Sequence, residues 1–349
     1  MHLITAENAA EYLRATGRVP PGVPLRAREL AGGVSNIVLR IDREGAPPIV
    51  LKQSRERLRV AMEWLSPLTR IWTEVAAMRL LAEILPDGRV PRIVFEDRAN
   101  YLYAMTCAPD EAVVWKARLL AGTTEPDVAR RAGAILGAIH AETAGAAVLD
   151  REPLADTSLF DSLRVDPYYR TVARVHPDLG PALEELIGSM AGPGDRALVL
   201  GDYSPKNILV HEDGLMVLDF ETAHAGDPAF DLGFFASHLL LKAFRAKRLG
   251  LWPEAYLSLL RTFVEAYAAR AGVDPRGDRS RRGARHAAAC LLARLDGKSP
   301  VDYRHELDAD AVRRFARGLL RAEAVPDLSE LTRRAAREML EQQKPSPVD

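Results

Sequence analysis

The sequence predicts an α+β protein with two lobes, a small lobe built on an antiparallel sheet and a larger, mainly helical lobe. A chain of 349 residues is long enough for two such lobes. Strand patterns separated by turns fill the first hundred residues, with one longer helix among them. After residue 108 the pattern is helical except for one hairpin. The predicted boundaries are 1–107 for the small lobe, 108–341 for the helical lobe and 342–349 for a polar tail.

The small lobe is predicted to open with a short helix that Thr5 can cap and Gly17 can close. The elements that follow are, in chain order, strands at Leu25–Leu30, Ile37–Asp42 and Pro48–Gln53, a helix at Leu68–Leu85, and strands at Arg92–Glu96 and Tyr101–Thr106. Glycine-containing turns separate the first three strands. Ala108-Pro109-Asp110 then breaks the pattern and marks the change to the helical lobe.

Charge and hydropathy argue against two classes of partner. The net charge of −1 creates no overall field that would attract nucleic acid or a membrane surface. The most apolar stretch, Phe230 to Phe244, is interrupted by Asp231, His238 and Lys242, so it does not read as a membrane span. With 48% hydrophobic and 27% charged residues, the composition is that of a globular enzyme.

The two cysteines and the first residues indicate a cytoplasmic protein. Cys107 and Cys290 are far apart and form no CxxC pair, which favours reduced thiols over a disulfide or zinc framework. The N-terminal segment contains acidic residues and no apolar core, unlike a secretory signal. The histidines form no HxxxH or HExxH pattern, so no metal-ligand cluster is predicted from them.

The most informative segment is LGDYSPKNILVHEDGLMVLDFE, residues 200–221. Within it, Ile208–His211 and Leu215–Leu218 are two apolar strands joined by a turn of three residues that ends in Gly214. A turn of this length with glycine in its last position suits a β-hairpin. The segment is therefore predicted to fold back on itself.

Three polar residues converge at the open end of this hairpin. If the strands pair symmetrically about the turn, Asn207 and Asp219 lie opposite each other with Cα atoms about 4.5–5.5 Å apart. An amide oxygen and a carboxylate so placed are suitable ligands for Mg²⁺. Asp202 lies on the preceding loop. The alternative is a surface hairpin whose Asp and Asn are ordinary turn residues.

The motif GDYSPKN at residues 201–207, followed by Asp219-Phe220-Glu221, resembles the catalytic and metal motifs of the aminoglycoside phosphotransferase/choline kinase superfamily. Within that superfamily, the motifs resemble most those of methylthioribose-kinase-like small-molecule kinases. The resemblance covers residues 25 to 303 or so. It implies a bilobal, protein-kinase-like fold that binds ATP and Mg²⁺ between its lobes.

The resemblance also implies roles for single residues. Asp202 would be the catalytic carboxylate that accepts or orients the proton of the substrate hydroxyl, and Asn207 and Asp219 would hold Mg²⁺. Glu221 stands where protein kinases have glycine. Asp231, at the start of an apolar helix, would brace the catalytic loop by accepting backbone N–H bonds, since a buried unpaired carboxylate would be costly.

The small lobe carries matching features. Gly33 and Ser35 lie in a turn that resembles a phosphate-covering loop, although two glycines in a turn are usually only a turn. Lys52 ends a strand and resembles the lysine that pairs with the α- and β-phosphates, although a single strand-end lysine is usually solvated. Glu74, on the following helix, would orient Lys52 through an ion pair.

Two assignments in the small lobe have alternatives. Arg70 and Glu63 are other charged residues near Lys52, in less suitable positions than Glu74. By resemblance, Met105 and Cys107 would belong to a hinge that offers backbone hydrogen bonds to adenine. A core strand or a simple linker is the alternative for that segment.

One residue departs from the family pattern. The family usually has histidine directly before Gly-Asp, and Leu200 stands there. The preceding apolar run, residues 197–199, indicates that Leu200 anchors the loop by burial instead. The alternative is a catalytically impaired pseudokinase that acts as a nucleotide-binding regulator or scaffold.

Two further motifs are weaker. Gly297-Lys298-Ser299 has the ending of a P-loop, but Leu292 stands where the first glycine is needed and a helix precedes it. The arginine-rich stretch at 276–285 is either a solvated loop and helix start or an anion site. The sequence thus predicts an ATP- and Mg²⁺-dependent phosphotransferase that acts on the hydroxyl of a small molecule, such as a sugar-like metabolite, an amino alcohol or an aminoglycoside-type drug.

Overall fold

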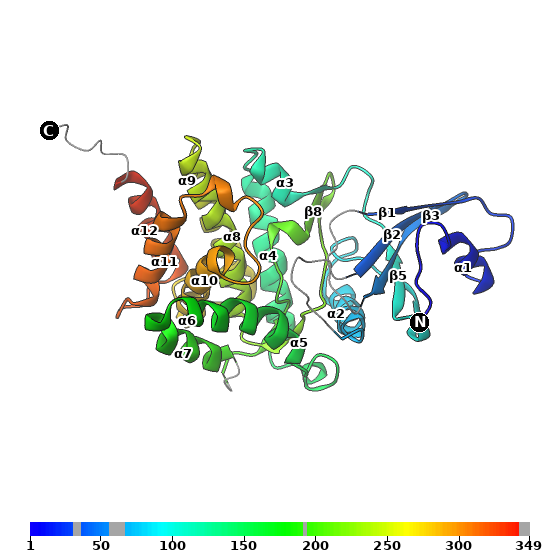
Figure 1. The fold of residues 1–349 in the computed structure, drawn as a ribbon, viewed down its shortest axis with the longest axis horizontal. Coiled ribbons are helices and arrows are strands. Elements are labelled where there is room, and N and C mark those ends of the chain that lie inside the picture. The colour runs from blue at the N-terminus through cyan, green and yellow to red at the C-terminus, as the bar shows by residue number, and fades with distance from the viewer. Residues whose placement is uncertain (31–35, 56–66, 191–193, 342–349) are drawn as a thin grey trace. The chain divides into compact units, whose positions relative to one another are not determined.

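The computed structural model describes residues 1–30, 36–55, 67–190 and 194–341. The chain forms two units. The first comprises Met1–Ala112 together with Met216–Glu221, and the second comprises Val113–Leu215 together with Thr222–Asp349. The first unit contains the blue strands of Figure 1, and the second contains most of the helices.

The first unit is built on a sheet of five antiparallel strands in the order β1-β2-β3-β5-β4. The strands are β1 (Leu25–Glu29), β2 (Asn36–Arg43), β3 (Ala46–Ser54), β4 (Ile93–Asp97) and β5 (Leu102–Thr106). They coincide with the five predicted strands to within two residues at each end. At the β2–β3 turn Gly45 has a φ of 72°, a conformation that favours glycine.

Alternation along β3 directs its side chains to two helices. Ile49 and Leu51 pack into one apolar cluster with Leu13 of α1 (Ala9–Ala15). Lys52 follows Leu51 and therefore points to the opposite face, where it meets α2 (Arg70–Ile84). The same strand thus supplies both the core of the unit and a residue of the candidate site.

The first helix is capped differently from the prediction. α1 begins after Asn8, and the Asn8 Oδ1 accepts a hydrogen bond from the Thr5 N–H. Thr5 therefore lies one turn before the helix and does not cap it. Gly17 does close the helix, with a φ of 66°.

The second unit is mainly helical. Its helices are α3 (Trp115–Leu120), α4 (Pro126–Thr143), α5 (Ser158–Phe160), α6 (Thr171–Val175), α7 (Gly180–Met190), α8 (Ala229–Arg248), α9 (Pro253–Ala271), α10 (Asp278–Asp296), α11 (Ala309–Leu320) and α12 (Leu328–Glu341). A π-helical stretch, Asp161–Arg170, joins α5 to α6.

Two close helix crossings form the core of this unit. A Cβ atom on Gly133 of α4 would lie 2.2 Å from the Phe263 carbonyl oxygen of α9. A Cβ atom on Gly233 of α8 would lie 2.4 Å from the Gly283 carbonyl oxygen of α10. Only glycine permits either approach, so these pairs of helices are locked against each other. α8 carries Asp231, which contacts the loop of Asp202, and is held rigidly by this packing.

Short strands position the loop that contains Asp202. β7 (Ala197–Val199) pairs with β10 (His224–Gly226), and a second sheet has the order β6-β8-β9. In this second sheet β6 is Val113–Val114, β8 is Ile208–His211 and β9 is Gly214–Val217. β8 and β9 are the predicted hairpin, and the loop of Asp202 runs from β7 to β8.

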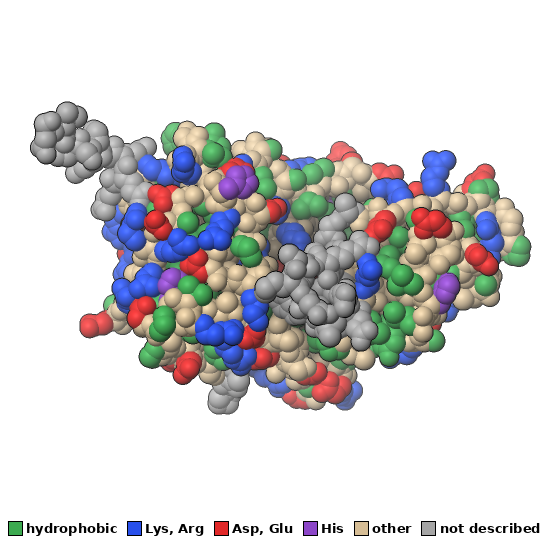
Figure 2. Space-filling model, viewed as in Figure 1, with side chains coloured by type: hydrophobic (Ala, Val, Ile, Leu, Met, Phe, Trp, Pro, Cys, Tyr) green, Lys and Arg blue, Asp and Glu red, His purple; other side chains and the backbone are tan. Residues whose placement is uncertain are grey.

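The predicted fold class, a small antiparallel sheet unit and a larger helical unit, is confirmed. Basic and acidic side chains are interspersed over the visible face of the molecule, as the small net charge leads one to expect (Figure 2). Within the described ranges, no helix combines the length and apolarity that crossing a membrane requires.

Candidate active site

Lys52 of β3 is held by two carboxylates of the first unit. Its Nζ lies 2.8 Å from Glu74 Oε1 and 3.0 Å from Asp219 Oδ1. The predicted Lys52–Glu74 ion pair is therefore formed. Burial by itself would lower the pKa of Lys52, but Asp219 and Glu74 outweigh burial and keep that pKa well above its usual value. The lysine is a fixed cation.

A second group of contacts holds Glu221. Arg70 of α2 is fully buried, and its Nε lies 3.3 Å from Glu221 Oε2. Asn36 Nδ2 donates to the same oxygen at 3.2 Å, and Arg70 donates to Asn36 Oδ1 at 3.3 Å. Arg70, an alternative residue near Lys52 in the sequence analysis, pairs with Glu221 instead. No local sequence pattern predicts this triangle, because its members come from three distant segments.

Carboxylates and cations gather in this part of the first unit. Glu74 and Asp219 pair with Lys52, and Glu221 pairs with Arg70. Asp219 also has a φ of 69°, a left-handed conformation that non-glycine residues rarely adopt and that is common at functional sites.

Asp231 braces the loop that contains Asp202 in the second unit. Its two carboxylate oxygens accept hydrogen bonds from the backbone N–H groups of Leu200, at 2.7 Å, and Gly201, at 2.9 Å. The side chain is fully buried at the start of α8. The backbone hydrogen bonds predicted for Asp231 are formed, and the catalytic role of the loop stays a prediction.

Further contacts lock the same loop. Thr222 Oγ1 donates to the Leu200 carbonyl at 3.0 Å, and a Cβ atom on Gly201, which has a φ of 74°, would lie 2.6 Å from that hydroxyl. Leu200 itself is 1% exposed. The leucine that replaces the usual histidine is therefore a core residue, as its apolar neighbours predict.

A histidine supports Asp231 from another helix. His140 of α4 places its Nε2 3.3 Å from Asp231 Oδ2, and its Nδ1 lies 2.9 Å from Tyr267 Oη. Arg279 donates to the same Tyr267 oxygen at 2.8 Å. These buried contacts fix the Asp231 carboxylate. Sequence analysis did not find His140, because it lies some sixty residues before the loop that it supports.

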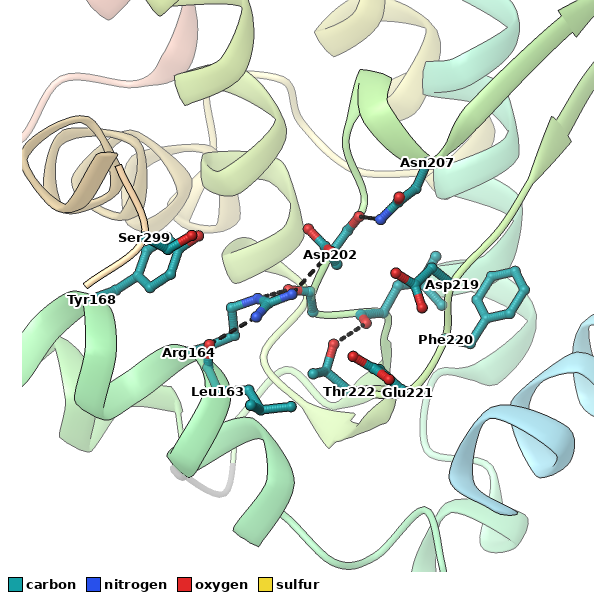
Figure 3. A network of polar contacts seen from close by, with 12 residues as sticks. Leu163, Arg164, Tyr168, Asp202, Asn207, Asp219, Phe220, Glu221, Thr222 and Ser299 are labelled. Carbon is teal, nitrogen blue, oxygen red and sulfur yellow. Dashed lines mark hydrogen bonds and ion pairs between the residues drawn. The ribbon is translucent and has the colours of Figure 1, made fainter. Parts of the chain in front are cut away.

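Asp202 and Asn207 lie on one loop, and an arginine holds the first of them (Figure 3). Arg164, from the π-helical stretch, lies 3.0 Å from Asp202 Oδ2 and donates its Nε–H to the Gly201 carbonyl at 2.7 Å. Asn207 Nδ2 donates to the Asp202 carbonyl at 3.1 Å. That bond commits the amide nitrogen and leaves Oδ1 as the atom that could bind a metal.

The remaining predicted site residues lie in the first unit. Gly33 and Ser35 fall outside the described residues. Met105 belongs to β5 and pairs with Val50 of β3, and Cys107 follows the strand half-buried. Their role as an adenine-binding hinge remains a prediction, as does the approach of Asn207 and Asp219 across the hairpin.

The arginine-rich stretch has a structural role. Arg279 pairs with Asp195 at 2.5 Å, Arg282 with Asp227 at 2.6 Å and Arg285 with Glu185 at 2.7 Å. These pairs hold α10 against neighbouring segments. For these three arginines the structure differs from both sequence-based interpretations, a solvated stretch and an anion site, because carboxylates of the protein itself engage them.

Comparison with known proteins agrees with this geometry. The chain is 25% identical over 268 residues to a methylthioribose kinase of Geobacillus sp. (strain WCH70), an alignment that spans 69% of this chain and 66% of the relative, just under two thirds of its length. It is 27% identical over 311 residues to the methylthioribose kinase of Geobacillus kaustophilus (strain HTA426), which covers 77% of this chain and 78% of the relative.

Solved structures share the fold. A choline/ethanolamine kinase family protein from Mesorhizobium loti matches 96% of this chain and 100% of its own, with a TM-score of 0.55 and 20% identity. The macrolide 2'-phosphotransferase MphH from Brachybacterium faecium matches 91% and 99%, with a TM-score of 0.54 and 22% identity. The model of the phosphotransferase enzyme family matches residues 26–273, which is most of the chain. The chain belongs to the phosphotransferase enzyme family.

Proposed function

We propose that the protein is an ATP- and Mg²⁺-dependent kinase that transfers the γ-phosphate to a hydroxyl group of a small molecule. The observation that carries the proposal is the state of Asp202, a partly exposed carboxylate on a loop whose backbone is held rigidly. Phosphoryl transfer depends mainly on positioning and charge stabilisation, and a rigid loop supplies the positioning.

In this proposal Asp202 accepts or orients the proton of the acceptor hydroxyl. Arg164, which pairs with Asp202, holds the carboxylate in position. Lys52, fixed by Glu74, binds phosphate oxygens of ATP. Asn207 and Asp219 would hold Mg²⁺, which would neutralise charge on the phosphates.

The acceptor is a small metabolite or drug. Methylthioribose, a neutral sugar, belongs among the compounds to test, because the relatives at 25% and 27% identity carry the name methylthioribose kinase. A cytoplasmic location, where ATP is abundant, fits the free thiols of Cys107 and Cys290. The pseudokinase alternative depended on Leu200, and the packing of that residue gives the alternative no support.

The test is ADP release from ATP and Mg²⁺ over a panel of hydroxyl compounds. We expect one class of acceptor to stimulate ADP release by the wild type. Asp202→Asn should lower turnover about 10²–10⁴-fold, the usual contribution of a general base, while ATP binding is retained. Equal turnover by the two proteins would remove Asp202 from the chemistry.

The metal has its own test. Asp219→Ala should abolish the Mg²⁺-dependent part of ATP affinity, whereas Asn207→Ala should weaken it less, because a neutral amide contributes less charge. Titration of ATP binding at several Mg²⁺ concentrations measures both effects. Unchanged Mg²⁺ dependence in both variants would exclude these residues as ligands.

A further inference from the structure

A buried lysine of α8 has a tyrosine ring and a backbone carbonyl beside it, but no carboxylate among the residues that the structure describes. Lys242 is 2% exposed, and its Nζ donates to the His238 carbonyl at 3.2 Å. Among the residues that the structure describes, no carboxylate lies within ion-pair distance of this ammonium group. An ammonium has three hydrogen atoms to donate, so the single carbonyl leaves donor capacity unused.

Other buried polar atoms near Lys242 are also unpartnered. Tyr303, whose ring centroid lies 5.7 Å from Lys242 Nζ, has a buried hydroxyl with no hydrogen-bond partner in the described parts of the chain. The same holds for His238 Nε2 and Arg294 Nε. Each of these atoms can donate a hydrogen bond, and a buried donor without an acceptor is costly. Together they are suited to bind an acceptor such as an oxyanion.

The surroundings carry excess positive charge. Lys116 Nζ lies 5.9 Å from the Tyr303 ring centroid and pairs with Asp302, a carboxylate whose side chain is 67% exposed. Burial, and then the cations Lys116 and Arg294, lower the pKa of Lys242 to about 7. A bound anion would relieve this repulsion and restore the charge on the lysine.

The cluster adjoins the catalytic loop within the second unit. Arg294 donates to Tyr168 Oη at 3.0 Å and to the Ser299 carbonyl at 2.7 Å. Arg164 Cζ lies 5.9 Å from the Tyr168 ring centroid, and the same arginine pairs with Asp202. In Figure 3 Arg164 accordingly lies between Tyr168 and Asp202. A small molecule with its hydroxyl at Asp202 would therefore have this cluster beside it.

We propose that the acceptor substrate is an anion, a hydroxyl compound whose carboxylate or phosphate group is bound by Lys242, Arg294 and Tyr303. The inference rests on the proposed kinase function and narrows its acceptor class. A neutral sugar or an amino alcohol would leave the buried donors unsatisfied, and a polycationic drug would be repelled by them.

The test begins with anion binding in the absence of nucleotide. Under this condition no phosphate is transferred, so the measured affinity reports only how the cluster binds the added anion. Isothermal titration uses inorganic phosphate, glycerate and glucose 6-phosphate, with glycerol and glucose as the neutral counterparts. Glycerate and glucose 6-phosphate distinguish a carboxylate from a phosphate ligand. The proteins are wild type, Lys242→Met, Lys116→Met and the control Lys247→Met, which makes the same substitution on α8 outside the cluster.

We expect at least one anion to bind the wild type tenfold or more tightly than its neutral counterpart. Lys242→Met should weaken that binding at least tenfold, Lys116→Met by a smaller factor, and Lys247→Met should leave it unchanged. Thermal unfolding of each variant verifies that it is folded. If Lys242→Met does not fold, Lys116→Met replaces it as the test variant, because the Lys116 side chain is partly exposed and its substitution disturbs the core less. Equal anion binding by wild type and both cluster variants would overturn the proposal.

Turnover separates this inference from the kinase proposal itself. With ATP and Mg²⁺, the wild type should show a higher kcat/KM for the anionic acceptor than for its neutral counterpart. A higher value for the neutral compound would contradict the anion site. Anion binding that depends on Lys242, without ADP release from any acceptor, would support the site and contradict the kinase proposal.

Discussion

Two buried lysines, one in each unit, are held in opposite ways. Lys52 of the sheet unit lies against the carboxylates of Glu74 and Asp219, which keep its pKa well above its usual value. Lys242 of the helical unit contacts one backbone carbonyl and is surrounded mainly by other cations, and its pKa falls to about 7. The two side chains are almost equally buried, so the difference lies in their partners.

The comparison indicates what each lysine is prepared to bind. A lysine already neutralised by two carboxylates is positioned in advance and can share its remaining donor capacity with a phosphate. A buried lysine without a carboxylate partner destabilises the fold until an anion binds beside it. The sheet unit is therefore complete before its ligand binds, whereas the helical unit is stabilised by its ligand.

The largest expected effect is on the free energy of unfolding, which Lys→Met should change in opposite directions at positions 52 and 242. Lys52→Met leaves the carboxylates of Glu74 and Asp219 without their cation and should destabilise the protein by about 3–5 kcal/mol. Lys242→Met removes an unpaired buried charge and should stabilise it by about 1–4 kcal/mol. Urea unfolding of both variants measures the difference. Stability changes of the same sign in both variants would show that the neighbouring charges do not make one lysine stabilising and the other destabilising.

The pH dependence of stability is the next largest effect. The folded pKa of Lys242 is about 7, below its ordinary value of 10.5, so the unfolded state binds more protons between these values. The free energy of unfolding should therefore rise with pH, by about 2 kcal/mol from pH 7 to pH 9. The charged groups around Lys242 are Lys116, Arg294, Arg245 and Asp302.

Lys242→Met should remove this rise, and denaturant unfolding at pH 7, 8 and 9 compares the variant with the wild type. Lys52 gives no such rise, because a raised pKa keeps it charged throughout this range. If the wild type and Lys242→Met have parallel pH profiles, Lys242 is not the titrating group.

The smallest effect is the coupling within the first unit. Lys52→Met and Glu74→Gln each break one ion pair, so their effects on stability and on the KM for ATP should be less than additive. A coupling of about 1 kcal/mol is expected for residues in contact. A double-mutant cycle measures it. Strict additivity would mean that the ion pair contributes nothing.

Local patterns predicted much of this molecule. Period-two alternation located the strands, and the resemblance to the kinase family implied the ion pair between Lys52 and Glu74, which is formed. An aspartate at the start of an apolar helix needs donors, and this argument identified Asp231. The first and the last of these inferences use neighbours in sequence or a cost that one residue carries alone.

Several other contacts between distant segments were not predicted. Arg70 meets Asn36 and Glu221, and Arg164 meets Asp202, only because the tertiary fold brings separate elements together. A signal for Lys242 did exist in the sequence. His238 and Lys242 interrupt the most apolar stretch of the chain, and this interruption argued only against a membrane span, although buried polar residues are commonly functional.

Thr5 shows the limit of local rules, because two residues competed for one position. Thr5 and Asn8 are both good helix-capping residues, and pattern alone does not choose between them. The helix begins after Asn8, whose side chain bonds the Thr5 backbone. Capping preferences predicted that the helix exists and missed its first residue.

Packing and Asp231 hold the loop that contains Asp202, and we propose that the enzyme is active with leucine at position 200. The decisive measurement is ADP release by wild type and Leu200→His with one accepted acceptor. The wild type should turn over, and Leu200→His should be equally or less active, because a polar ring enters an apolar site without a partner. An inert wild type and a more active Leu200→His would contradict the account.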